Sequence, residues 1–240
     1  MNRILYDSDE LSEGRLLLRD SRADHIRKVL KSKPGDSLRL GEIDGPLAEG
    51  RILIVDDQRV EMEITQGERP RRPSLDLLLA LPRPKVLKRL LPQISALGVD
   101  RLFLTNAAKV ERFYFDSHVL DPSFMRNALV EGLIQCGDTC LPRVKVLWSF
   151  PEFFETPLAG HQCWLLHPGA EKSLLTAPVT GPRQLLAIGP EGGWRETEVK
   201  RFREAGFESV NLGKRILRSD TACICALGMA AAKGERYGRS

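Results

Sequence analysis

Two glycine-rich turns in the last third of the chain have the composition of a ligand site. The first follows the apolar run 185–188 and contains Gly189, Pro190, Glu191, Gly192 and Gly193. Glycines cost conformational entropy and fill no core. We therefore interpret them as backbone that approaches a ligand just beyond the carboxyl end of a strand. Alone, the pattern is more often an ordinary tight turn. Its spacing is that of neither a dinucleotide-binding motif nor a P-loop, and Glu191 would repel a phosphate.

The second turn lies about 25 residues later and strengthens the first interpretation. Residues 210–222 predict a short strand, a turn at Gly213, a cationic stretch with Arg218, and a helix capped by Ser219 or Asp220. A solvated basic loop before a core helix would have the same pattern. Two strand-to-glycine junctions so close together nevertheless favour a shared small-molecule site.

Composition limits what the whole chain can be. Its 240 residues include 36 basic and 32 acidic side chains, a net charge of +4, and 42% are hydrophobic. This apolar content excludes a disordered or collagen-like chain, and no run is long enough to span a bilayer. The first residues lack the apolar stretch of a signal peptide, so we expect a cytoplasmic protein. So small an excess of positive charge cannot bind nucleic acid by itself, and any RNA contact must depend on local basic patches.

The five cysteines predict reduced thiols rather than a metal centre. A zinc site could be written with Cys136, Cys140, Cys163 and His167. The last two, however, lie four residues apart in an expected strand, about 13 Å from each other. We therefore expect no metal.

The elements that must position these motifs fall into two groups. The first 72 residues predict one helix at 24–30, capped by Asp24, among short strands. This pattern indicates a small β-barrel. The expected strands are residues 15–19, 37–43, 49–55 and 59–65.

A polar, proline-bearing segment at 68–73 indicates a linker. Beyond it, apolar strands alternate with helices, which predicts a parallel sheet covered on both faces. We therefore divide the chain into domains 1–72 and 73–240, the second of the α/β class. The expected strands of the second domain are 74–81, 99–105, 143–148, 163–167, 184–188 and 209–212, and the expected helices are 84–97, 123–136, 196–205 and 221–232.

The two glycine motifs together resemble the signature of the RsmE family. The matching residues are 188–194 with Glu198 and Val199, and 212–218 with Thr221 and Ala222. Further similarity is found at 24–30, 34–36, 96–99 and 167–168, so the resemblance covers most of the chain. Members of this family are S-adenosylmethionine-dependent methyltransferases of the SPOUT superfamily, which methylate N3 of a uridine in 16S ribosomal RNA of the small subunit.

The resemblance implies a fold, a partner and a cofactor site. It implies an N-terminal PUA-like RNA-binding β-barrel, a C-terminal SPOUT α/β domain with a trefoil knot, and a homodimer. The substrate would be 16S ribosomal RNA or the assembled small subunit, and the cofactor S-adenosyl-L-methionine. The implied cofactor residues are His167, Pro168, Gly189, Pro190, Glu191, Gly192, Gly193, Leu212, Gly213, Ile216, Leu217, Arg218 and Thr221.

Methylation of uridine N3 requires loss of a proton and stabilisation of the resulting anion. A guanidinium presents two donors in a plane and stays charged, so we assign this catalytic role to Arg218. A phosphate contact or a structural ion pair is an equally good interpretation of the same residue, and no general base can be named. The residues expected to contact RNA are Arg3, His25, Arg27, Lys28, Arg83 and Arg112.

The chain departs from the family pattern on the substrate side. Gln93 and Ala96 stand where a lysine and a glutamate are usual, Ile134 replaces a glutamate, and Asp138 replaces an arginine. Arg112 or Arg126 could supply the missing cation. The sequence therefore leaves open a methyltransferase of the same fold acting on another RNA nucleotide, or a non-catalytic RNA-binding protein that kept the fold.

Overall fold

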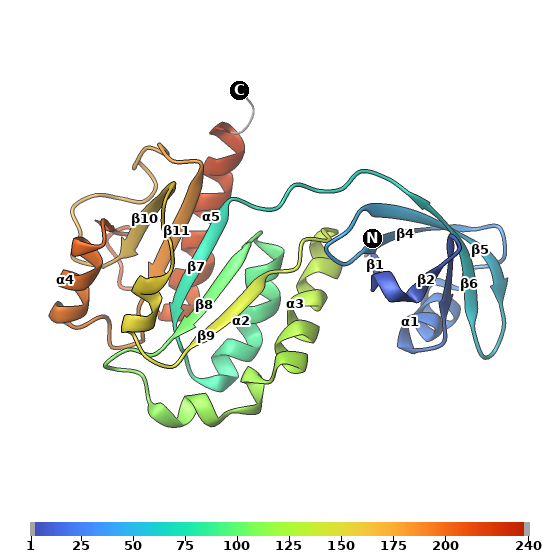
Figure 1. Cartoon of the computed structure of the whole chain (residues 1–240), viewed down its shortest axis with the longest axis horizontal. Helices are drawn as coiled ribbons and strands as arrows, with labels where there is room; N and C mark the ends of the chain where they lie inside the picture. The colour runs from blue at the N-terminus through green and yellow to red at the C-terminus, as the bar shows by residue number, and fades with distance from the viewer. Residues whose placement is uncertain (1–2, 238–240) are drawn as a thin grey trace. The chain divides into compact units, whose positions relative to one another are not determined.

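The chain forms two compact units in the computed structural model, which describes residues 3–237 (Figure 1). The first unit comprises the chain up to Arg72 together with Leu133–Leu141, and the second comprises Pro73–Gly132 and the chain from Pro142 onward. The segment 133–141 therefore returns to the first unit, which the sequence did not predict.

A single six-stranded sheet curls around the core of the first unit. Its order is β1-β4-β5-β6-β3-β2, with β1 parallel to β4 and every other pair antiparallel. Alternation places Leu16 and Leu18 of β3 in the core, whereas Arg15 and Leu17 are exposed. The strands are β1 (Ile4–Tyr6), β2 (Leu11–Ser12), β3 (Arg15–Leu18), β4 (Ser37–Glu42), β5 (Leu47–Val55) and β6 (Val60–Gln66).

The predicted helix of the first unit begins earlier than expected. One α-helical turn, α1 (Ser21–Asp24), continues as a π-helix, η2 (His25–Leu30). The cap is Asp20, whose carboxylate accepts a hydrogen bond from the Arg22 N–H at 2.9 Å. The prediction of Asp24 as the cap was therefore wrong. Because Asp20 starts the helix a turn sooner, Asp24 lies inside it, and its carboxylate pairs with Arg27 and Lys28.

The second unit is built on a six-stranded sheet in which every pair is parallel, as the sequence predicts. The order is β12-β10-β11-β7-β8-β9. Its central strand β7 (Leu75–Ala80) is buried at every residue, which explains its near-continuous apolar sequence. The other strands are β8 (Arg101–Thr105), β9 (Arg143–Leu147), β10 (His161–Leu166), β11 (Arg183–Ile188) and β12 (Glu208–Val210).

Helices cover both faces of this sheet. On one face, Val199 and Phe202 of α4 pack with alternate strand residues such as Leu78 and Leu185 in one buried cluster. On the other, α5 contacts β11 and α2, and Figure 1 shows α2, α3 and α5 behind the sheet with α4 at its left. The helices are α2 (Pro84–Ala96), α3 (Pro122–Cys136), α4 (Glu196–Glu204) and α5 (Ser219–Tyr237), and the short 3₁₀ turns η3 (Arg112–Asp116), η4 (His118–Leu120) and η5 (Pro151–Glu155) lie between them.

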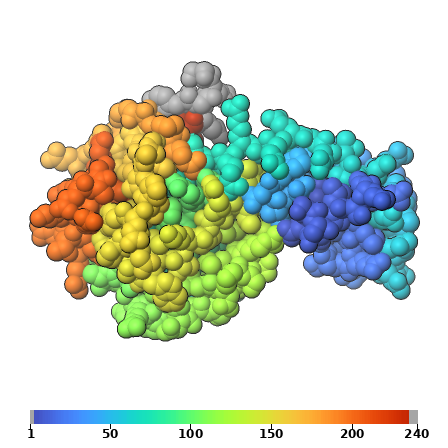
Figure 2. All heavy atoms as spheres, viewed as in Figure 1, coloured from blue at the N-terminus to red at the C-terminus, as the bar shows by residue number. Residues whose placement is uncertain are grey.

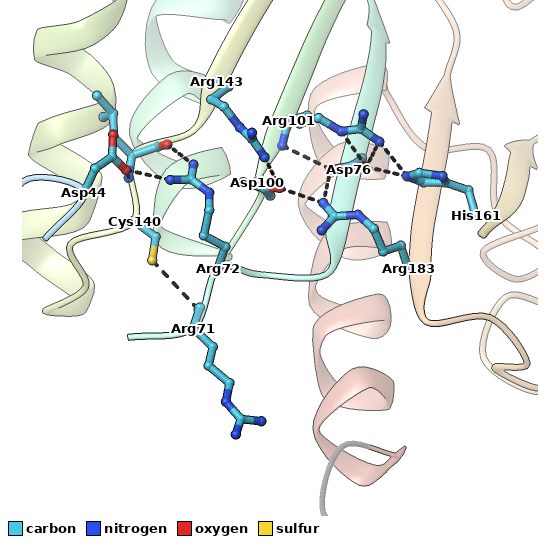
Figure 3. Close-up of polar contacts among 11 residues, drawn as sticks. Asp44, Arg71, Arg72, Asp76, Asp100, Arg101, Cys140, Arg143, His161 and Arg183 are labelled. Carbon is cyan, nitrogen blue, oxygen red and sulfur yellow. Dashed lines mark hydrogen bonds and ion pairs between the residues drawn. The ribbon is translucent and has the colours of Figure 1, made fainter. Parts of the chain in front are cut away.

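A buried ion network closes the edge of the sheet at which the strands begin, here called the amino edge (Figure 3). Its two carboxylates, Asp76 and Asp100, have fully buried side chains. Arg183 joins them, at 2.8 Å from Asp76 and 2.7 Å from Asp100. The remaining members are Arg101 at 2.6 Å and His161 at 3.0 Å from Asp76, and Arg143 at 2.6 Å from Asp100.

Candidate functional site

The opposite edge, here called the carboxyl edge, contains a cavity of about 400 Å³ where three strands end. β10 pairs in parallel with β11 on one side and with β12 on the other. Their last residues, Leu166, Ile188 and Val210, therefore reach the same place and line the cavity floor. The volume lies within the range of small-molecule sites. The expectation that the two glycine motifs meet beyond the strand ends is confirmed.

The turn after β11 forms one wall of this cavity. Its ends approach each other because the Gly193 N–H donates to the Pro190 carbonyl at 2.8 Å. Gly189 lies close to Trp194, because a Cβ there would be 3.0 Å from the indole Nε1 and the indole would have to shift. The Trp194 indole is 7% exposed, and this nitrogen has no hydrogen-bond partner. The backbone of the glycine turn therefore forms most of this wall, and the indole N–H of Trp194 is an unpaired donor in it.

The segment after β12 forms the second wall, and Asn211 organises it. The Asn211 side chain accepts from the Gly213 N–H at 2.9 Å and donates to the Ala170 carbonyl at 2.8 Å. It thus joins the loops that follow β12 and β10. Gly213 has φ of +111°, a conformation that favours glycine. Sequence reasoning did not assign a role to Asn211. The signal was an amide side chain two residues before a glycine, which is typical of a local turn.

The structure brings together eleven of the thirteen predicted cofactor residues. Arg218 and Thr221 are the two that do not line the cavity. The eleven are His167, Pro168, Gly189, Pro190, Glu191, Gly192, Gly193, Leu212, Gly213, Ile216 and Leu217. The other lining residues, which sequence reasoning did not assign, are Leu166, Gly169, Ile188, Trp194, Val210, Asn211, Arg215, Ser219 and Ala222.

Arg218 directly precedes α5, between the cavity-lining residues Leu217 and Ser219. Its side chain is 75% exposed, and its Nε is 3.9 Å from Oδ1 of Asp220. Arg89 on α2 approaches the other oxygen of Asp220 at 3.4 Å. The guanidinium of Arg218 is therefore only loosely held by the protein and is open to solvent. Thr221, also exposed, uses its backbone N–H to donate to Asp220 at 2.9 Å.

Charged side chains connect the glycine turn to neighbouring loops. Glu191 pairs with Arg83 at 3.4 Å. Lys109, in the loop after β8, donates to the Gly192 carbonyl at 2.6 Å. The buried carboxylate of Glu198 accepts from the backbone N–H groups of Ala108 and Arg195, at 2.8 and 2.7 Å. These bonds tie the turn to the start of α4 and to the loop after β8.

The residues predicted to contact RNA differ in their hydrogen bonding within the protein, and two of them donate to backbone carbonyls. Arg3 donates to the carbonyls of Gly137 and Leu40, at 3.0 and 2.5 Å, and burial lowers the pKa of its guanidinium. Arg27 donates to the carbonyl of Asp56 at 2.9 Å.

The other four predicted RNA contacts have exposed side chains. His25 and Lys28 lie on the helical segment of the first unit. Arg83 lies at the carboxyl edge of the second unit and is paired with Glu191. Arg112 begins η3 and has no hydrogen bond or ion pair within residues 3–237.

Two of the four unusual residues on the substrate side, Ile134 and Asp138, have hydrogen-bond partners in the first unit. The Asp138 carboxylate accepts from the N–H groups of Thr139 and Cys140 at 2.6 and 3.1 Å. The carbonyl of Ile134 accepts from the N–H of Arg3 at 3.4 Å. Asp138 thus shapes the turn after α3. On α2, Gln93 is exposed and Ala96 is half-buried.

The part of the chain that the structure describes contains no group of three or more side chains arranged to hold a metal ion. Burial raises the pKa of Cys163 to about 11 and that of Cys223 to about 12, so both thiols stay protonated at neutral pH. Within the same residues, none of the helices has the length and apolar character that crossing a bilayer requires.

Comparison with known proteins gives the same class as the fold and cavity. A family model described as an RNA methyltransferase domain matches residues 69–231. The chain is 33% identical to a ribosomal RNA small subunit methyltransferase E of Treponema pallidum, over 100% of this chain and 94% of that protein. It is 26% identical to a ribosomal RNA small subunit methyltransferase E 1 of Borreliella burgdorferi, over 97% and 98%.

Solved structures resemble the whole chain. A ribosomal RNA small subunit methyltransferase E from Neisseria gonorrhoeae, bound to S-adenosyl methionine, superposes with a TM-score of 0.78 at 24% identity, covering 97% of each chain. A putative methyltransferase from Legionella pneumophila with bound cofactor superposes with a TM-score of 0.74 at 25% identity, covering 96% of this chain and 97% of the other.

The second unit is therefore an RNA methyltransferase domain of mixed α/β fold. Taken as a whole, the chain belongs to the ribosomal RNA small subunit methyltransferase E family.

Proposed function

We propose that this chain is an S-adenosylmethionine-dependent methyltransferase that methylates N3 of a uridine in 16S ribosomal RNA of the small subunit. The observation that carries the proposal is the convergence of the glycine turn and the 211–217 segment on one cavity at the ends of β10, β11 and β12. Family membership supports the reaction and the substrate.

The lining of the cavity suits this cofactor. Its apolar part, contributed by Ile188, Leu212 and Leu217, offers contact for an adenine ring. Its polar part consists of the backbone of the glycine turn and the unpartnered Trp194 nitrogen, which offer hydrogen bonds to the ribose and amino-acid portions. Ile216 at the rim is 86% exposed, so a ligand there would cover apolar surface. When bound, S-adenosylmethionine supplies an activated methyl group.

Arg218 is the proposed catalytic residue. Uridine N3 carries a proton at neutral pH, so transfer requires that the anion on N3 and the flanking carbonyls be stabilised. A guanidinium can do this with two parallel donors and without titrating. The loose 3.9 Å contact with Asp220 leaves these donors available.

The first unit is proposed as the RNA-binding module, with a PUA-like barrel as its finer description. His25 and Lys28 present exposed side chains on one short helical segment, which suits contact with a phosphate backbone. Arg3 and Arg27 are assigned to structure instead, because backbone carbonyls already accept their hydrogen bonds.

Three further features belong to this proposal. The α/β domain is threaded as a trefoil knot, the active enzyme is a homodimer, and it works in the cytoplasm where small subunits are made. The near-neutral charge of the chain suits recognition of a folded RNA site by shape and a few placed cations.

The first experiment separates the enzyme from its alternatives. Calorimetric titration of the purified protein with S-adenosylmethionine should release heat and raise the melting temperature. Absence of both at millimolar cofactor would contradict the methyltransferase function and favour a non-catalytic RNA-binding protein.

The second experiment identifies the nucleotide. Mass spectrometry of ribosomal RNA from cells lacking the protein should show loss of one N3-methylated uridine in 16S RNA. Loss of a different methylated nucleotide would support an altered target, which the departures at Gln93, Ala96 and Asp138 make the relevant alternative. Incubating deficient small subunits, or free 16S RNA, with protein and cofactor then shows which form is the substrate.

A further inference from the structure

The glycine turn after β11 has little packing of its own to fix its shape. Three of its five residues are glycines, and glycine has more backbone freedom than any other residue. Gly193 has φ of +71°, and no atom lies within 4 Å of the position that a Cβ would take there. The bond from the Gly193 N–H to the Pro190 carbonyl closes the turn but does not attach it to the rest of the domain. Contacts from outside the turn must therefore hold this wall of the cavity in place.

Glu198, on the first turn of α4, supplies such a contact through both of its carboxylate oxygens. One oxygen accepts from the N–H of Arg195 at 2.7 Å, which is the usual bond of a capping box. The other accepts from the N–H of Ala108 at 2.8 Å, although Ala108 lies 90 positions earlier in the chain. A glutamine could make the first bond, but its amide nitrogen would then face the second N–H, and only a carboxylate accepts on both sides. The second bond is therefore what requires a glutamate.

Ala108 belongs to the loop 106–110 after β8, here called the β8 loop, and this loop is itself anchored. The N–H of Asn106 donates to the carbonyl of Leu147, at the end of β9, at 3.2 Å. Ala107 is 6% exposed and belongs to the buried cluster that also contains residues of α4. The β8 loop is therefore a fixed support rather than a second flexible segment.

Lys109, the next residue of the β8 loop, contacts the glycine turn itself. Its ammonium donates to the Gly192 carbonyl at 2.6 Å. Its stem packs on the turn, since a Cβ on Gly192 would lie 2.9 Å from the Lys109 Cδ. In Figure 2 the light green surface near residue 110 adjoins the orange surface of the 190–205 segment. The contacts form a closed ring that runs through Glu198, Ala108, Lys109, Gly192 and Arg195.

We propose that Glu198 and Lys109 are positioning residues, which brace the glycine turn through the β8 loop in the shape that the cofactor requires. Neither side chain lines the cavity. The ring restricts the conformations of a glycine-rich turn, and a ligand binds more tightly when more of the protein already has the binding-competent conformation. This inference rests on the proposed function, because it takes S-adenosylmethionine as the ligand of the cavity.

Hydrogen exchange of the cofactor-free full chain tests the brace without any ligand. In Glu198→Gln one of the two N–H groups loses its acceptor. Exchange measured by mass spectrometry should therefore become about 10-fold faster in peptides that cover 106–110 and 190–196. Peptides from β7 and β10 should exchange as in wild type, because these strands lie outside the ring.

Glu152→Gln is the matched control. The Glu152 carboxylate also accepts a backbone N–H near the start of a helical turn, that of Ser149 at 3.0 Å. It lies in the second unit and outside the cavity lining. This variant should change exchange only near η5 and leave cofactor affinity at the wild-type value.

Calorimetric titration with S-adenosylmethionine measures the effect on affinity. Glu198→Gln and Lys109→Met should each weaken binding by about 5- to 10-fold, as expected if the competent form of the turn falls to about a fifth to a tenth of the population. Lys109→Met keeps the stem and removes the donor, whereas Lys109→Arg keeps a donor and should recover most of the affinity. The double variant should bind only slightly more weakly than either single variant, because each change opens the same ring.

Kinetics separate positioning from contact with the RNA. In Lys109→Met, KM for the cofactor should rise by about 5- to 10-fold. At saturating cofactor kcat should stay at the wild-type value, because the bound cofactor itself then holds the turn. KM for RNA should also be unchanged.

Three results would overturn the brace. One is wild-type exchange in 190–196 together with wild-type cofactor affinity in Glu198→Gln. Another is faster exchange throughout the second unit of that variant, which would make Glu198 a residue of general stability. The third is a higher KM for RNA and an unchanged KM for the cofactor in Lys109→Met, which would make Lys109 an RNA contact.

The brace and the proposed function fail separately. If wild-type protein gives neither heat nor thermal stabilisation with S-adenosylmethionine, the proposed function fails. Hydrogen exchange of the cofactor-free protein still shows whether Glu198 and the β8 loop hold the glycine turn.

Discussion

The two edges of the parallel sheet in the second unit differ in how their polar side chains are buried and paired. At the amino edge, Asp76 and Asp100 are fully buried, and three arginines and a histidine bind them at 2.6 to 3.0 Å (Figure 3). At the carboxyl edge, the Trp194 nitrogen has no partner and the Arg218 side chain is 75% exposed. The paired carboxylates of the amino edge hold the strands together, although the buried Arg183 Nε has no hydrogen-bond partner. At the carboxyl edge, the Trp194 nitrogen and the Arg218 guanidinium are available to a ligand.

The largest effect should come from breaking the amino edge. Asp76→Ala leaves Arg101 and Arg183 partly buried without one of their carboxylates, which should lower the free energy of unfolding by about 3–5 kcal/mol. Urea denaturation of the full chain measures this change. The control is Glu208→Ala, which removes an exposed pair with Lys172 and should cost less than about 1 kcal/mol. Equal losses of unfolding free energy in the two variants would mean that the buried network stabilises the fold no more than an exposed ion pair does.

The second prediction concerns a variant at the carboxyl edge that should lose activity and keep its stability. Arg218→Ala should lower kcat for RNA methylation by about 100- to 1000-fold, because the transition-state anion loses its cation. The melting temperature should stay within a degree or two of wild type, since the side chain is mostly in solvent. Arg218→Lys keeps the charge without the planar fork and should recover only part of the rate. Wild-type activity in Arg218→Ala would remove this residue from catalysis.

A third prediction concerns the backbone of the cavity wall. Gly213→Ala forces an alanine to φ near +111°, so the turn should shift and cofactor affinity should fall by about 10-fold or more. Calorimetric titration with S-adenosylmethionine measures the loss. Gly206→Ala is matched to it, because Gly206 also has positive φ, +85°, and open space around its Cα, but lies outside the cavity. That control should lose similar stability and no affinity.

The smallest effect on stability should come from the ion cluster of Arg22, Glu10 and Asp20 in the first unit. Its side chains are partly exposed, unlike the buried carboxylates of the amino edge. Hydrogen bonds from Arg22 lower the pKa values of Glu10 and Asp20 below their ordinary 4.5 and 3.8. Carboxylates with lowered pKa stabilise the fold above the unfolded-state pKa, and this contribution is lost as pH falls through the folded-state value. Stability should therefore decline below about pH 4.5.

Arg22→Ala should remove about 1 kcal/mol at pH 7 and much less at pH 3, which flattens the acid side of the profile. Urea midpoints across this pH range provide the measurement. Arg15→Ala, which breaks the more exposed pair with Glu61, should leave the profile unchanged. A parallel shift of the Arg22→Ala curve at every pH would exclude the carboxylates as the source of the dependence.

Sequence reasoning located the cavity because its evidence was local and directional. Apolar runs ending at Ile188 and Val210, each followed by a glycine turn, predict two strand ends, and a parallel sheet brings such ends to one edge. The strands β1 and β2 were missed because three and two residues are too short to show alternation. The helix cap moved from Asp24 to Asp20 because both positions carry an aspartate, and only the observed hydrogen bond distinguishes them.

The amino edge could not be predicted in the same way. Asp76 stands within an apolar strand, where it could equally have been an outward-facing residue. Its burial follows from the central place of β7 between β11 and β8, and its partners come from strands that begin at residues 101, 161 and 183. No local pattern relates these positions.

By itself, the sequence determined the class of the second unit, the edge of the sheet at which the two glycine motifs meet, and the family motifs that form the cavity there. These follow from periodicity and glycine placement, which act over a few residues. Only the tertiary structure decided which polar groups are satisfied. Strand order brings Asp76 to Arg101, Arg183 and His161, which are distant in the sequence, because hydrogen bonding depends on which elements become neighbours.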